Sequence, residues 1–509
     1  MKRDGAQIIR ERLSREHGAV IKNWGGKLPI ALVYPNSYFI GMSNLGIQAI
    51  YKLLNNYTDC VCERVFVESE GVPLSMESML PLTDFAVIAF SISYELDYFN
   101  LPRILKAAGI PLYSKDRNAT HPLLIAGGPC VTANGLPLAP FFDCLCIGEA
   151  EVILPFMLPV LREGVSENRT EFLKQLAKLP GIHVPGYSKQ PAVRQWVKNM
   201  DASPVHSIVL TRDTELGGMY LIEVERGCNW GCKFCLVSNC FKPMRFHSVE
   251  SLLAQGKEGL KYRKKLGLLG PAVTDHPHIE EIVTKLSGMG AEISVSSLRI
   301  KPLVISVLTD VIEGGARTMA LAPEAGSQRI RDFIGKRIDE EDILEAVEKV
   351  ALQAISQIKL YFMIGLPSET DDDILEIVRL VKKCRERMEM HRPSSRITLT
   401  ISAFIPKALT PFQREGMAPL VTLNRRLALL KNKLSQKGFS VKNESIEWAE
   451  IQAVLSRGDE KLSPVIAGME SISLAQWHRA VKQSGIDTEY YAHQKWDQLQ
   501  KLSWETIQS

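Results

Sequence analysis

The sequence has no strong charge imbalance and no long apolar run. Its 61 Lys and Arg residues against 57 Asp and Glu residues leave a net charge of +4 over 509 residues, which is too small to indicate binding to nucleic acid or to an anionic membrane. No segment offers the 18 or more uninterrupted apolar residues that a membrane span requires, and the first residues lack the apolar block of a signal peptide. We therefore expect a cytoplasmic protein without a membrane span or a nucleic-acid partner.

Length and composition indicate a globular protein of two or three domains. The chain is 45% hydrophobic and 23% charged, which is ordinary for globular proteins, and 509 residues exceed the size of one typical domain. Its ten cysteines should stay reduced in the cytoplasm, so a cluster of cysteines favours a metal site over disulfides.

Residues 1–162 alternate between short apolar runs and helical patterns. Strand–helix alternation of this kind predicts an α/β domain with a doubly wound parallel sheet, whose ligands bind beyond the carboxyl ends of the strands. Residues 163–215 have few apolar runs and several Pro and Gly residues, which predicts a linker with some local structure. The runs that predict strands of the first domain are 29–36, 60–68, 84–93, 122–128 and 141–148.

The alternation resumes over residues 216–440, where six strand–helix repeats predict a second α/β unit. A partial (β/α)6 barrel is one way to arrange such repeats. Residues 441–509 read as short helices, and we expect a small helical C-terminal domain that buries its tryptophans. The six apolar runs of the second unit are 219–227, 266–273, 291–295, 317–322, 357–364 and 396–404, and the four tryptophans are Trp448, Trp477, Trp496 and Trp504.

The segment RGCNWGCKFC places Cys228, Cys232 and Cys235 within eight residues. A structural zinc site normally has four protein ligands; Cys240 would have to be the fourth, and no paired CxxC arrangement is present. Three thiolates instead suit a four-iron cluster that keeps one iron open to a substrate or cofactor. Gly227 and Gly231 would let the backbone wrap such a cluster closely. Zinc and three packed structural thiols are the alternatives.

The stretch CNWGCKFC resembles the CxxxCxxC motif of the radical S-adenosylmethionine (SAM) enzymes, which follows the first strand of a partial barrel. The resemblance implies that Cys228, Cys232 and Cys235 bind three irons of a [4Fe-4S] cluster and that S-adenosylmethionine chelates the fourth iron. One electron, from an external donor of the flavodoxin or ferredoxin type, would then yield a 5′-deoxyadenosyl radical. Phe234 matches an aromatic position that lies near the adenine.

Four further segments resemble later cofactor-side motifs of this family. The family's Gly-Gly-Glu stretch corresponds to GLLGPAVTDHP (267–277), which has no Glu, and Gly270 is the candidate that remains. Asp275 in this segment is interpreted as a helix N-cap. The resemblance also implies S-adenosylmethionine contacts by Ser297, Arg299, Glu324 and Ser327, each of which is also a plausible strand-end or cap residue. Gly365 and Pro367 of FMIGLPSET (362–370) match a late-strand motif near the adenine and are the remaining cofactor-side residues.

The first domain resembles the cobalamin-binding domain of one large branch of the family. GGP at 127–129 and IGEAE at 147–151 match the branch's loops around the cofactor. No Asp-x-His-x-x-Gly motif is present, so we expect that no protein histidine ligates the cobalt. The resemblance implies that cobalamin lies against Tyr34, Asn36, Gly41, Met42, Gly127, Gly128, Gly148 and Glu149.

The whole chain resembles an uncharacterised group of cobalamin-binding radical SAM enzymes, which share segments like LSRGDE (455–460) and LSWETI (502–507). The resemblance implies a methyltransferase that acts on an unactivated carbon of a small-molecule, peptide or protein substrate, through a 5′-deoxyadenosyl radical and methylcobalamin. A cobalamin-dependent radical cyclase or rearrangement enzyme is one alternative. The other is a methylthiotransferase with a second iron–sulfur cluster, although buried structural thiols are the preferred interpretation of Cys60, Cys62, Cys130, Cys144 and Cys146.

Overall fold

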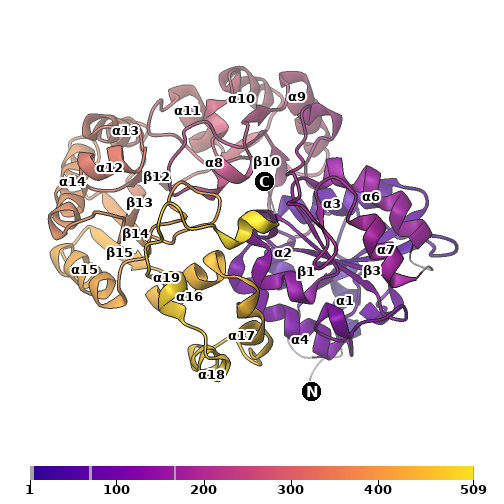
Figure 1. Cartoon of the computed structure of the whole chain (residues 1–509). Coiled ribbons are helices and arrows are strands. Elements are labelled where there is room, and N and C mark those ends of the chain that lie inside the picture. Colours follow the sequence, from indigo (N-terminus) through magenta and orange to yellow (C-terminus); the bar gives the residue numbers. More distant parts are fainter. Residues whose placement is uncertain (1–4, 68–70, 165–167, 508–509) are drawn as a thin grey trace.

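The computed structural model describes residues 5–67, 71–164 and 168–507. Two α/β units lie side by side (Figure 1), and the first is built on a sheet with strand order β2-β1-β3-β4-β5-β6. Strands β1 to β5 are parallel, and β6 pairs antiparallel with β5. The doubly wound parallel sheet predicted from the five apolar runs is therefore present. The strands are β1 (Leu28–Tyr34), β2 (Cys60–Phe66), β3 (Val87–Ser91), β4 (Leu123–Gly127), β5 (Cys144–Cys146) and β6 (Ile182–His183).

Helices cover both faces of this sheet. Ile30 and Leu32 of β1 pack into the core that α3, α6 and α7 share, whereas Ala31 and Val33 pack into the core with α4 and α5. Because both faces are covered, the strands read as nearly continuous apolar runs. The helices of this unit are α1 (Gly5–Leu13), α2 (Tyr38–Gly41), α3 (Leu45–Asn56), α4 (Asn100–Ala107), α5 (Pro129–Asn134), α6 (Ala150–Gly164) and α7 (Arg169–Leu176).

The segment predicted as a linker, 163–215, extends the first sheet. It contains α7 and β6, and Gln195 forms an isolated parallel bridge with Gly148 beyond β5. These residues satisfy backbone groups at the end of the sheet, since the amide of Ile147 donates to Gly181 and the amide of Gln195 donates to Ile147. The pairing of β6 thus carries the first sheet past residue 162, while the division of the chain into domains stays a prediction.

Apart from one short two-stranded ribbon, the second unit contains all six predicted strands and one more. They form two parallel sheets, β11-β10-β7 and β12-β13-β14-β15, inside an arc of helices that run around the outside in Figure 1. The seventh strand, β15, lies across the predicted boundary at 440. The strands are β7 (Tyr220–Glu223), β10 (Lys265–Leu269), β11 (Glu292–Val295), β12 (Met319–Glu324), β13 (Gln357–Ile364), β14 (Arg396–Ala403) and β15 (Phe439–Asn443).

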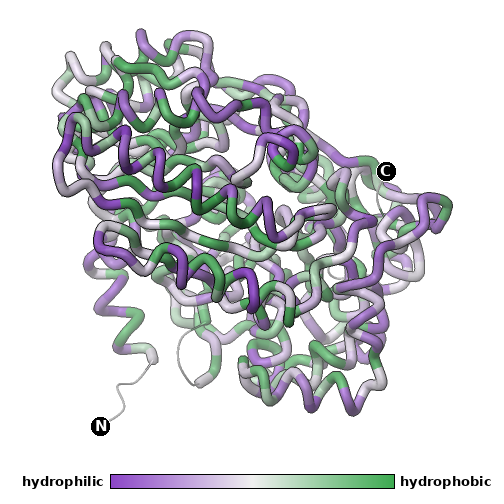
Figure 2. Tube along the Cα trace, turned by 90° about the vertical axis from the view of Figure 1, so that its left-hand side faces the viewer, coloured by the Kyte–Doolittle hydropathy of each residue, from purple (hydrophilic) through white to green (hydrophobic). Residues whose placement is uncertain are grey.

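The helices of the barrel alternate polar and apolar residues along their length, as the purple and green segments of Figure 2 show, which is the pattern of helices with one face on a core. A two-stranded ribbon of β8 (Glu225–Arg226) and β9 (Arg245–Phe246) flanks the first strand. The helices are α8 (Leu236–Cys240), α9 (Val249–Gly259), α10 (Ile279–Gly288), α11 (Ile305–Glu313), α12 (Gln328–Phe333), α13 (Glu340–Leu352), α14 (Asp371–Glu389) and α15 (Leu420–Lys433).

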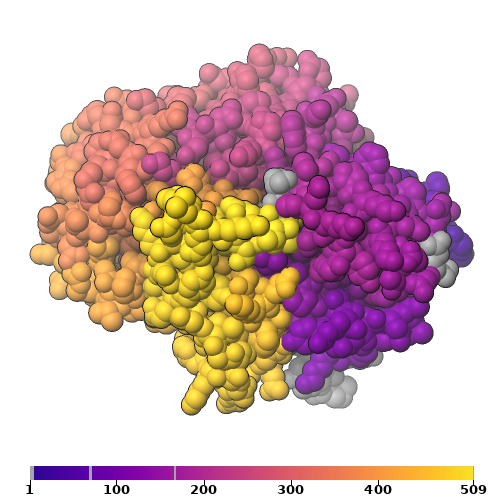
Figure 3. Space-filling view, in the orientation of Figure 1, coloured from indigo at the N-terminus to yellow at the C-terminus, as the bar shows by residue number. Residues whose placement is uncertain are grey.

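The C-terminal helices are α16 (Ile446–Arg457), α17 (Ser463–Ala467), α18 (Leu474–Ser484) and α19 (Thr488–Ala492). They touch both α/β units on the face seen in Figure 3, and Asn134 of the first unit donates to the carbonyls of Ser456 and Gly458. Trp477, Trp496 and Trp504 are at most 4% exposed, and Trp448 is partly buried against the same core. The predicted burial of the tryptophans is confirmed.

In the part of the chain that the structure describes, no helix combines the length and the apolarity needed to cross a membrane.

Candidate functional site

The cysteine triplet lies on a loop between β8 and α8, and glycines shape that loop. Gly227 has φ +89°, and a Cβ there would lie 2.5 Å from the carbonyl oxygen of Phe241. Gly231 has φ +68°, a conformation that side chains with a Cβ rarely adopt. Both glycines are therefore required by the backbone path that brings Cys228, Cys232 and Cys235 together.

The three thiols share one environment. Cys228 and Cys235 are partly exposed, while Cys232 is 9% exposed. Burial raises the pKa of Cys232, the neighbouring Lys336 lowers it, and the charges of Cys235 and Cys228 raise it further. Within the described residues these thiols do not form a set of ligand atoms within 4.8 Å of one another, as the ligands of one zinc ion would. The triplet is more open, which suits a cluster in which each thiolate takes a different iron.

Arg299 lies beside the cysteine loop. Its guanidinium carbon is 3.7 Å from the centre of the Trp230 ring, and its Nε is 3.7 Å from Oδ1 of Asp275. Burial lowers the pKa of Arg299, whereas Asp275, Cys228 and Cys232 raise it. The interpretation of Asp275 as a helix N-cap was wrong: α10 begins at Ile279 with His278 at its N-cap, and the Asp275 carboxylate instead accepts a hydrogen bond from the indole of Trp230.

Serines at the end of β11 hold the backbone of Gly270. The amide of Gly270 donates to Oγ of Ser296 over 3.1 Å, and the hydroxyls of Ser296 and Ser297 both donate to its carbonyl. A Cβ at Gly270 would overlap the carboxylate of Glu225. Ser297 thus lies next to Gly270, its contact with S-adenosylmethionine stays a prediction, and sequence reasoning missed its neighbour Ser296.

Glu225 is a buried carboxyl group that sequence reasoning also missed. It lies on β8, is 1% exposed, and accepts a hydrogen bond of 2.6 Å from the amide of Ala272 through Oε1. Its Oε2 has no hydrogen-bond partner. Burial, together with the charges of Glu223 and Asp275, raises the pKa of Glu225 to about 8. The sequence feature that could have pointed to Glu225 is its place as an acidic residue in the strand-like run directly before the cysteine loop.

The other predicted barrel residues divide between the site and the fold. Glu324 adopts φ +70° at a register shift between β12 and β13 and accepts from Nζ of Lys336 over 3.2 Å; such strain in a residue other than glycine is frequent at functional sites. Ser327 caps α12, accepting from the amide of Ile330 and donating to Asp373 over 2.5 Å. Ser327 therefore acts as a helix cap, as its alternative interpretation predicted.

The end of β13 gathers the remaining predicted residues: Gly365 and Pro367 follow it in the chain, and Phe234 packs near it. Phe234 packs against an apolar cluster that includes Met363 and Phe412. Gly365 has φ +80°, and a Cβ there would lie 2.5 Å from Leu423, so the packing of α15 requires this glycine. Pro367 is partly buried. The structure thus brings Phe234 of the cysteine loop close to the late-strand segment, while its place beside the adenine stays a prediction.

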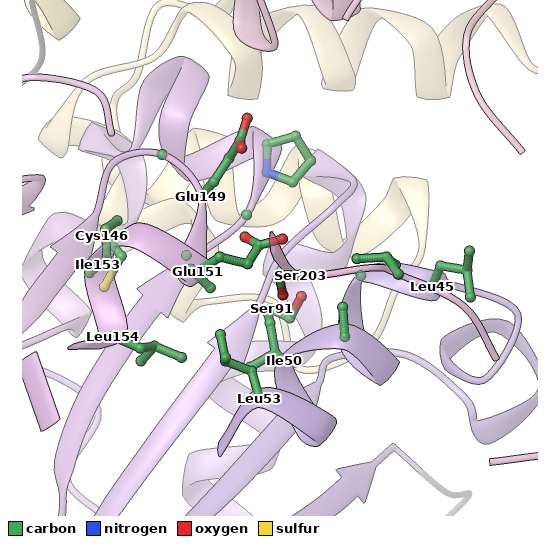
Figure 4. A pocket seen from close by; sticks show the side chains of 18 of the residues that line it. Leu45, Ile50, Leu53, Ser91, Cys146, Glu149, Glu151, Ile153, Leu154 and Ser203 are labelled. Carbon is green, nitrogen blue, oxygen red and sulfur yellow. The ribbon is translucent and has the colours of Figure 1, made fainter. Parts of the chain in front are cut away.

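A cavity of about 840 Å³ runs from the first sheet to the barrel. Side chains of α3 (Leu45, Ile50, Leu53) and of α6 (Ile153, Leu154) line it, with Ser91 of β3 between them in Figure 4. Its rim contains four of the predicted cobalamin residues, Gly127, Gly128, Gly148 and Glu149, together with Ser93 and Thr132, which were not predicted. On the barrel side the lining is Glu223, Glu225, Arg226, Gly227, Val237, Cys240, Phe241, Leu269, Gly270 and Pro271.

The other four predicted residues, from the first loop, do not line this cavity. Asn36 donates to Asp97 over 2.7 Å, and the sulfur of Met42 accepts from Arg64. A Cβ at Gly41 would overlap the ring of Phe66, so the packing of the loop accounts for this glycine. Tyr34 is 4% exposed; burial and the charge of Asp97 raise its pKa, and hydrogen bonds with Ser93 and Asn44 on the cavity wall oppose that rise.

An ion-pair cluster joins the cavity rim to the cysteine loop. Glu149 accepts from Arg226 and from Arg245, each over 2.8 Å, and Arg226 also donates to Glu151 and Glu223. Burial would raise the pKa of Glu149, but hydrogen bonds from Arg245 and the charge of Arg226 hold it below its ordinary value. Because Arg226 directly precedes Gly227 in the chain, the loop after β5 and the cysteine loop are held together.

Cysteines of the first unit are spread through its core. Cys60 and Cys62 lie on β2, and Cys144 and Cys146 lie on β5. Four strand spacings separate β2 from β5 in the sheet, which is about 19 Å at about 4.8 Å each. The two pairs are therefore too far apart to hold one cluster, and Cys60, Cys62, Cys130 and Cys144 are buried.

Two family models match the chain, "Radical SAM proteins, N-terminal" over residues 46–185 and "Radical SAM superfamily" over residues 222–381. An uncharacterized protein of Methanocaldococcus jannaschii, MJ0966, is 31% identical over 438 residues, which is 85% of this chain and 89% of the relative. The chain belongs to the radical SAM superfamily. The resemblance carried by CNWGCKFC is confirmed, and the protein is a radical SAM enzyme.

More distant relatives of this radical SAM enzyme carry names of two kinds. The uncharacterized methyltransferase PH0819 of Pyrococcus horikoshii is 28% identical over 280 residues, covering 51% of this chain and 58% of the relative. A tRNA-2-methylthio-N(6)-dimethylallyladenosine synthase of a Thermoanaerobacter species is 23% identical over 299 residues, covering 54% and 63%. Each name belongs to a protein that matches only about half of this chain.

Among solved structures, the fold is similar to that of OxsB, a cobalamin-dependent S-adenosylmethionine radical enzyme that was solved with aqua-cobalamin and S-adenosylmethionine bound. The TM-score is 0.53 at 14% identity, and the match covers 91% of this chain and 72% of OxsB. At this level of identity the likeness shows the shared fold, in which a first α/β unit precedes the radical SAM barrel.

Proposed function

We propose that this radical SAM enzyme depends on cobalamin and transfers a methyl group to an unactivated carbon of its substrate. The observation that carries the proposal is the cavity that begins at the carboxyl ends of β3, β4 and β5 and reaches the barrel beside the cysteine loop. Open parallel sheets bind their ligands at that edge. The fold of OxsB and the name of PH0819 support the same function.

The residues around the cysteine loop fit an iron–sulfur cluster with S-adenosylmethionine. Cys228, Cys232 and Cys235 would hold the cluster, and the loop glycines leave room for it. Arg299 and Lys336 bring positive charge to the thiolates. When bound, the cluster and S-adenosylmethionine supply a carbon-centred radical, and cobalamin supplies a methyl group. We expect the electron from an external donor of the flavodoxin or ferredoxin type, and a cytoplasmic location stays a prediction from the sequence.

The cavity also fits a corrinoid. Its deep end, between α3 and α6, is lined by apolar side chains such as Leu54 and Leu158, which suits the flat aromatic base of a nucleotide tail. The one histidine among the lining residues, His206, uses both ring nitrogens, one toward Lys52 and the other toward Tyr220 and Ser207. That no protein histidine ligates the cobalt stays a prediction.

The chain's own groups would position the reactants rather than react. The pairs that join Glu149 to Arg226 and Arg245 keep the two cofactor loops at a fixed separation and are themselves largely shielded from water. The proposal places the substrate between the two α/β units. The spread of thiols over β2 and β5 does not support a second cluster, so methylthio transfer is disfavoured despite the names of several relatives.

Isotope transfer tests the proposed reaction. The reduced enzyme with cobalamin is incubated with S-adenosylmethionine carrying a deuterated methyl group and with fractions of small molecules and peptides. The proposal predicts 5′-deoxyadenosine and a product that gains one labelled methyl group, as mass spectrometry would show. Formation of 5′-deoxyadenosine with a rearranged or cyclised product that carries no label would contradict methyl transfer and favour the cyclase or rearrangement alternative.

A further inference from the structure

Two buried polar atoms on the cavity wall have no partner in the protein. Across the described residues, the cavity-lining side chains with a buried unpartnered atom are Arg194, through Nη1, and Glu225, through Oε2. A buried donor or acceptor without a hydrogen bond costs about 1–3 kcal/mol, and more when it is charged. Atoms of this kind are frequently completed by a ligand.

Arg194 is held at the carboxyl edge of the first sheet. Its neighbour in sequence, Gln195, bridges to Gly148, and its Nη2 donates to the carbonyl of Lys242. Burial lowers the pKa of Arg194, while Cys240 and Glu149 raise it. The guanidinium therefore has one N–H group committed to the protein and another, on Nη1, that is available to a ligand oxygen.

Glu225 faces the same cavity from the barrel. The amide of Ala272 satisfies Oε1, and Gly270 leaves space for the carboxyl group because a Cβ there would overlap it. The charged groups that act on Glu225 are Glu223 and Asp275, both acidic, so in the described part of the chain no cation pairs with it. Glu149 and Arg226 line the same cavity, but the guanidinium of Arg226 donates to the carboxylate of Glu149, so these two groups already have partners.

We propose that Arg194 and Glu225 bind the rim of the corrinoid, so that the segment before the barrel and the barrel itself complete a site begun by the first sheet. Corrinoids carry primary amides and a phosphodiester. Arg194 donates to a carbonyl or phosphate oxygen, and Oε2 of Glu225 hydrogen-bonds a side-chain amide, donating to its carbonyl while the carboxyl group is protonated and accepting from its N–H group once it is ionised. This assignment rests on the proposed function. The assignment goes beyond the proposed function because it names two corrinoid-binding residues that lie outside the first α/β unit, β1 to β5.

The test measures binding rather than turnover. Full-length protein is purified anaerobically with its cluster, and hydroxocobalamin binding is followed by its visible absorbance, with S-adenosylmethionine binding measured separately by equilibrium dialysis. The variants are Arg194→Met and Glu225→Leu, with Arg194→Lys and Glu225→Gln as conservative changes. The matched controls are Arg212→Met and Glu215→Leu, at exposed positions of the segment that precedes the barrel. Circular dichroism and iron content show whether each variant folds and keeps its cluster.

We expect Arg194→Met and Glu225→Leu each to weaken hydroxocobalamin binding by about 10- to 100-fold, since each loses a hydrogen bond that involves an ionisable group. The conservative variants lose less, the exposed controls match the unmodified protein, and S-adenosylmethionine binding changes less than twofold. If Arg194→Met does not fold, a Kd for Arg194→Lys equal to that of the unmodified protein overturns the assignment of Arg194.

Three results contradict the inference in different ways. Hydroxocobalamin binding that is unchanged in both variants overturns it and leaves the proposed function intact. A Glu225→Leu variant that loses S-adenosylmethionine but keeps hydroxocobalamin assigns Glu225 to the ammonium group of S-adenosylmethionine instead. If the unmodified protein binds no hydroxocobalamin, the proposed function fails, and this inference fails with it.

Discussion

The first sheet and the barrel present different surfaces to the cavity between them. On the sheet side the strands give the wall an apolar surface, with Ile30, Val87 and Ile125, and polar residues such as Thr132 and Glu149 lie with the glycines at its rim. On the barrel side it carries Glu223, Glu225 and Arg226. The sheet therefore gives the cavity its shape, while the barrel supplies directional polar contacts close to the cysteine loop. The two walls predict different effects when they are changed.

The largest expected effect comes from the barrel's cysteine loop. Replacing Cys228, Cys232 or Cys235 with Ala should abolish formation of 5′-deoxyadenosine and remove most of the bound iron, because each thiolate holds one iron. Chromatographic detection of 5′-deoxyadenosine and an iron assay check this. Cys240→Ala, a buried cysteine five residues further on, is the control and should keep both. A triplet variant that still cleaves S-adenosylmethionine would remove the cluster assignment.

The next effect comes from filling the apolar wall. Ala89→Phe places a ring in the cavity beside β3 and should lower the corrinoid content of the purified protein at least 100-fold, because the added volume has nowhere else to go. Iron content should be unchanged. Val421→Phe, at a position that is 81% exposed, serves as the control. Full corrinoid content in Ala89→Phe would mean that the cofactor lies outside this cavity.

The junction between the two walls is tested through Glu149. Glu149→Ala leaves Arg226 and Arg245 without their shared carboxylate, and removing one partner of a buried ion pair costs about 3 kcal/mol or more. We expect the free energy of unfolding in urea to fall by that amount. Glu171→Ala, which breaks an exposed pair with Lys174, should change it little. Equal effects for the two variants would refute the role of the Glu149 cluster as a buried junction.

The last effect is on the pH dependence of stability, and it leaves both cofactor sites intact. The pKa of Glu225 is raised from 4.5 to about 8 in the folded protein, so between those values the folded state keeps a proton that the unfolded chain has released. The free energy of unfolding therefore decreases as pH rises through this window. Glu225→Gln, which does not titrate, should show a flatter decrease from pH 5 to 8 in urea unfolding. An identical slope in both proteins would show that Glu225 ionises normally.

Much of the fold was predictable because it follows from local patterns. The apolar runs at 29–36 and 357–364 are buried on parallel sheets, so their hydrophobicity alone marked β1 and β13. The cysteine loop was predictable because three thiols within eight residues have few other uses. Ser327 and Gly365 show the limit of a motif match, since the cap of α12 and the packing of α15 explain them as well as a cofactor contact does.

The rest of the site depends on distances that sequence patterns do not encode. Arg194 lies in a segment predicted as a linker, and the lack of a partner for its Nη1 is a property of the folded arrangement. Glu149 was predicted as a cofactor residue, but its contacts with Arg226 and Arg245 come from another part of the chain. The error at Asp275 has the same origin, because Trp230 is 45 residues away in sequence.

The central claim is that one chain holds an iron–sulfur cluster and a corrinoid on the two sides of one cavity. The most direct measurement is the content of iron, sulfide and corrinoid in protein that is produced with cobalamin and purified without oxygen. We predict about four irons and one corrinoid per chain. Four irons with no corrinoid, even after hydroxocobalamin is added to the purified protein, would contradict the claim.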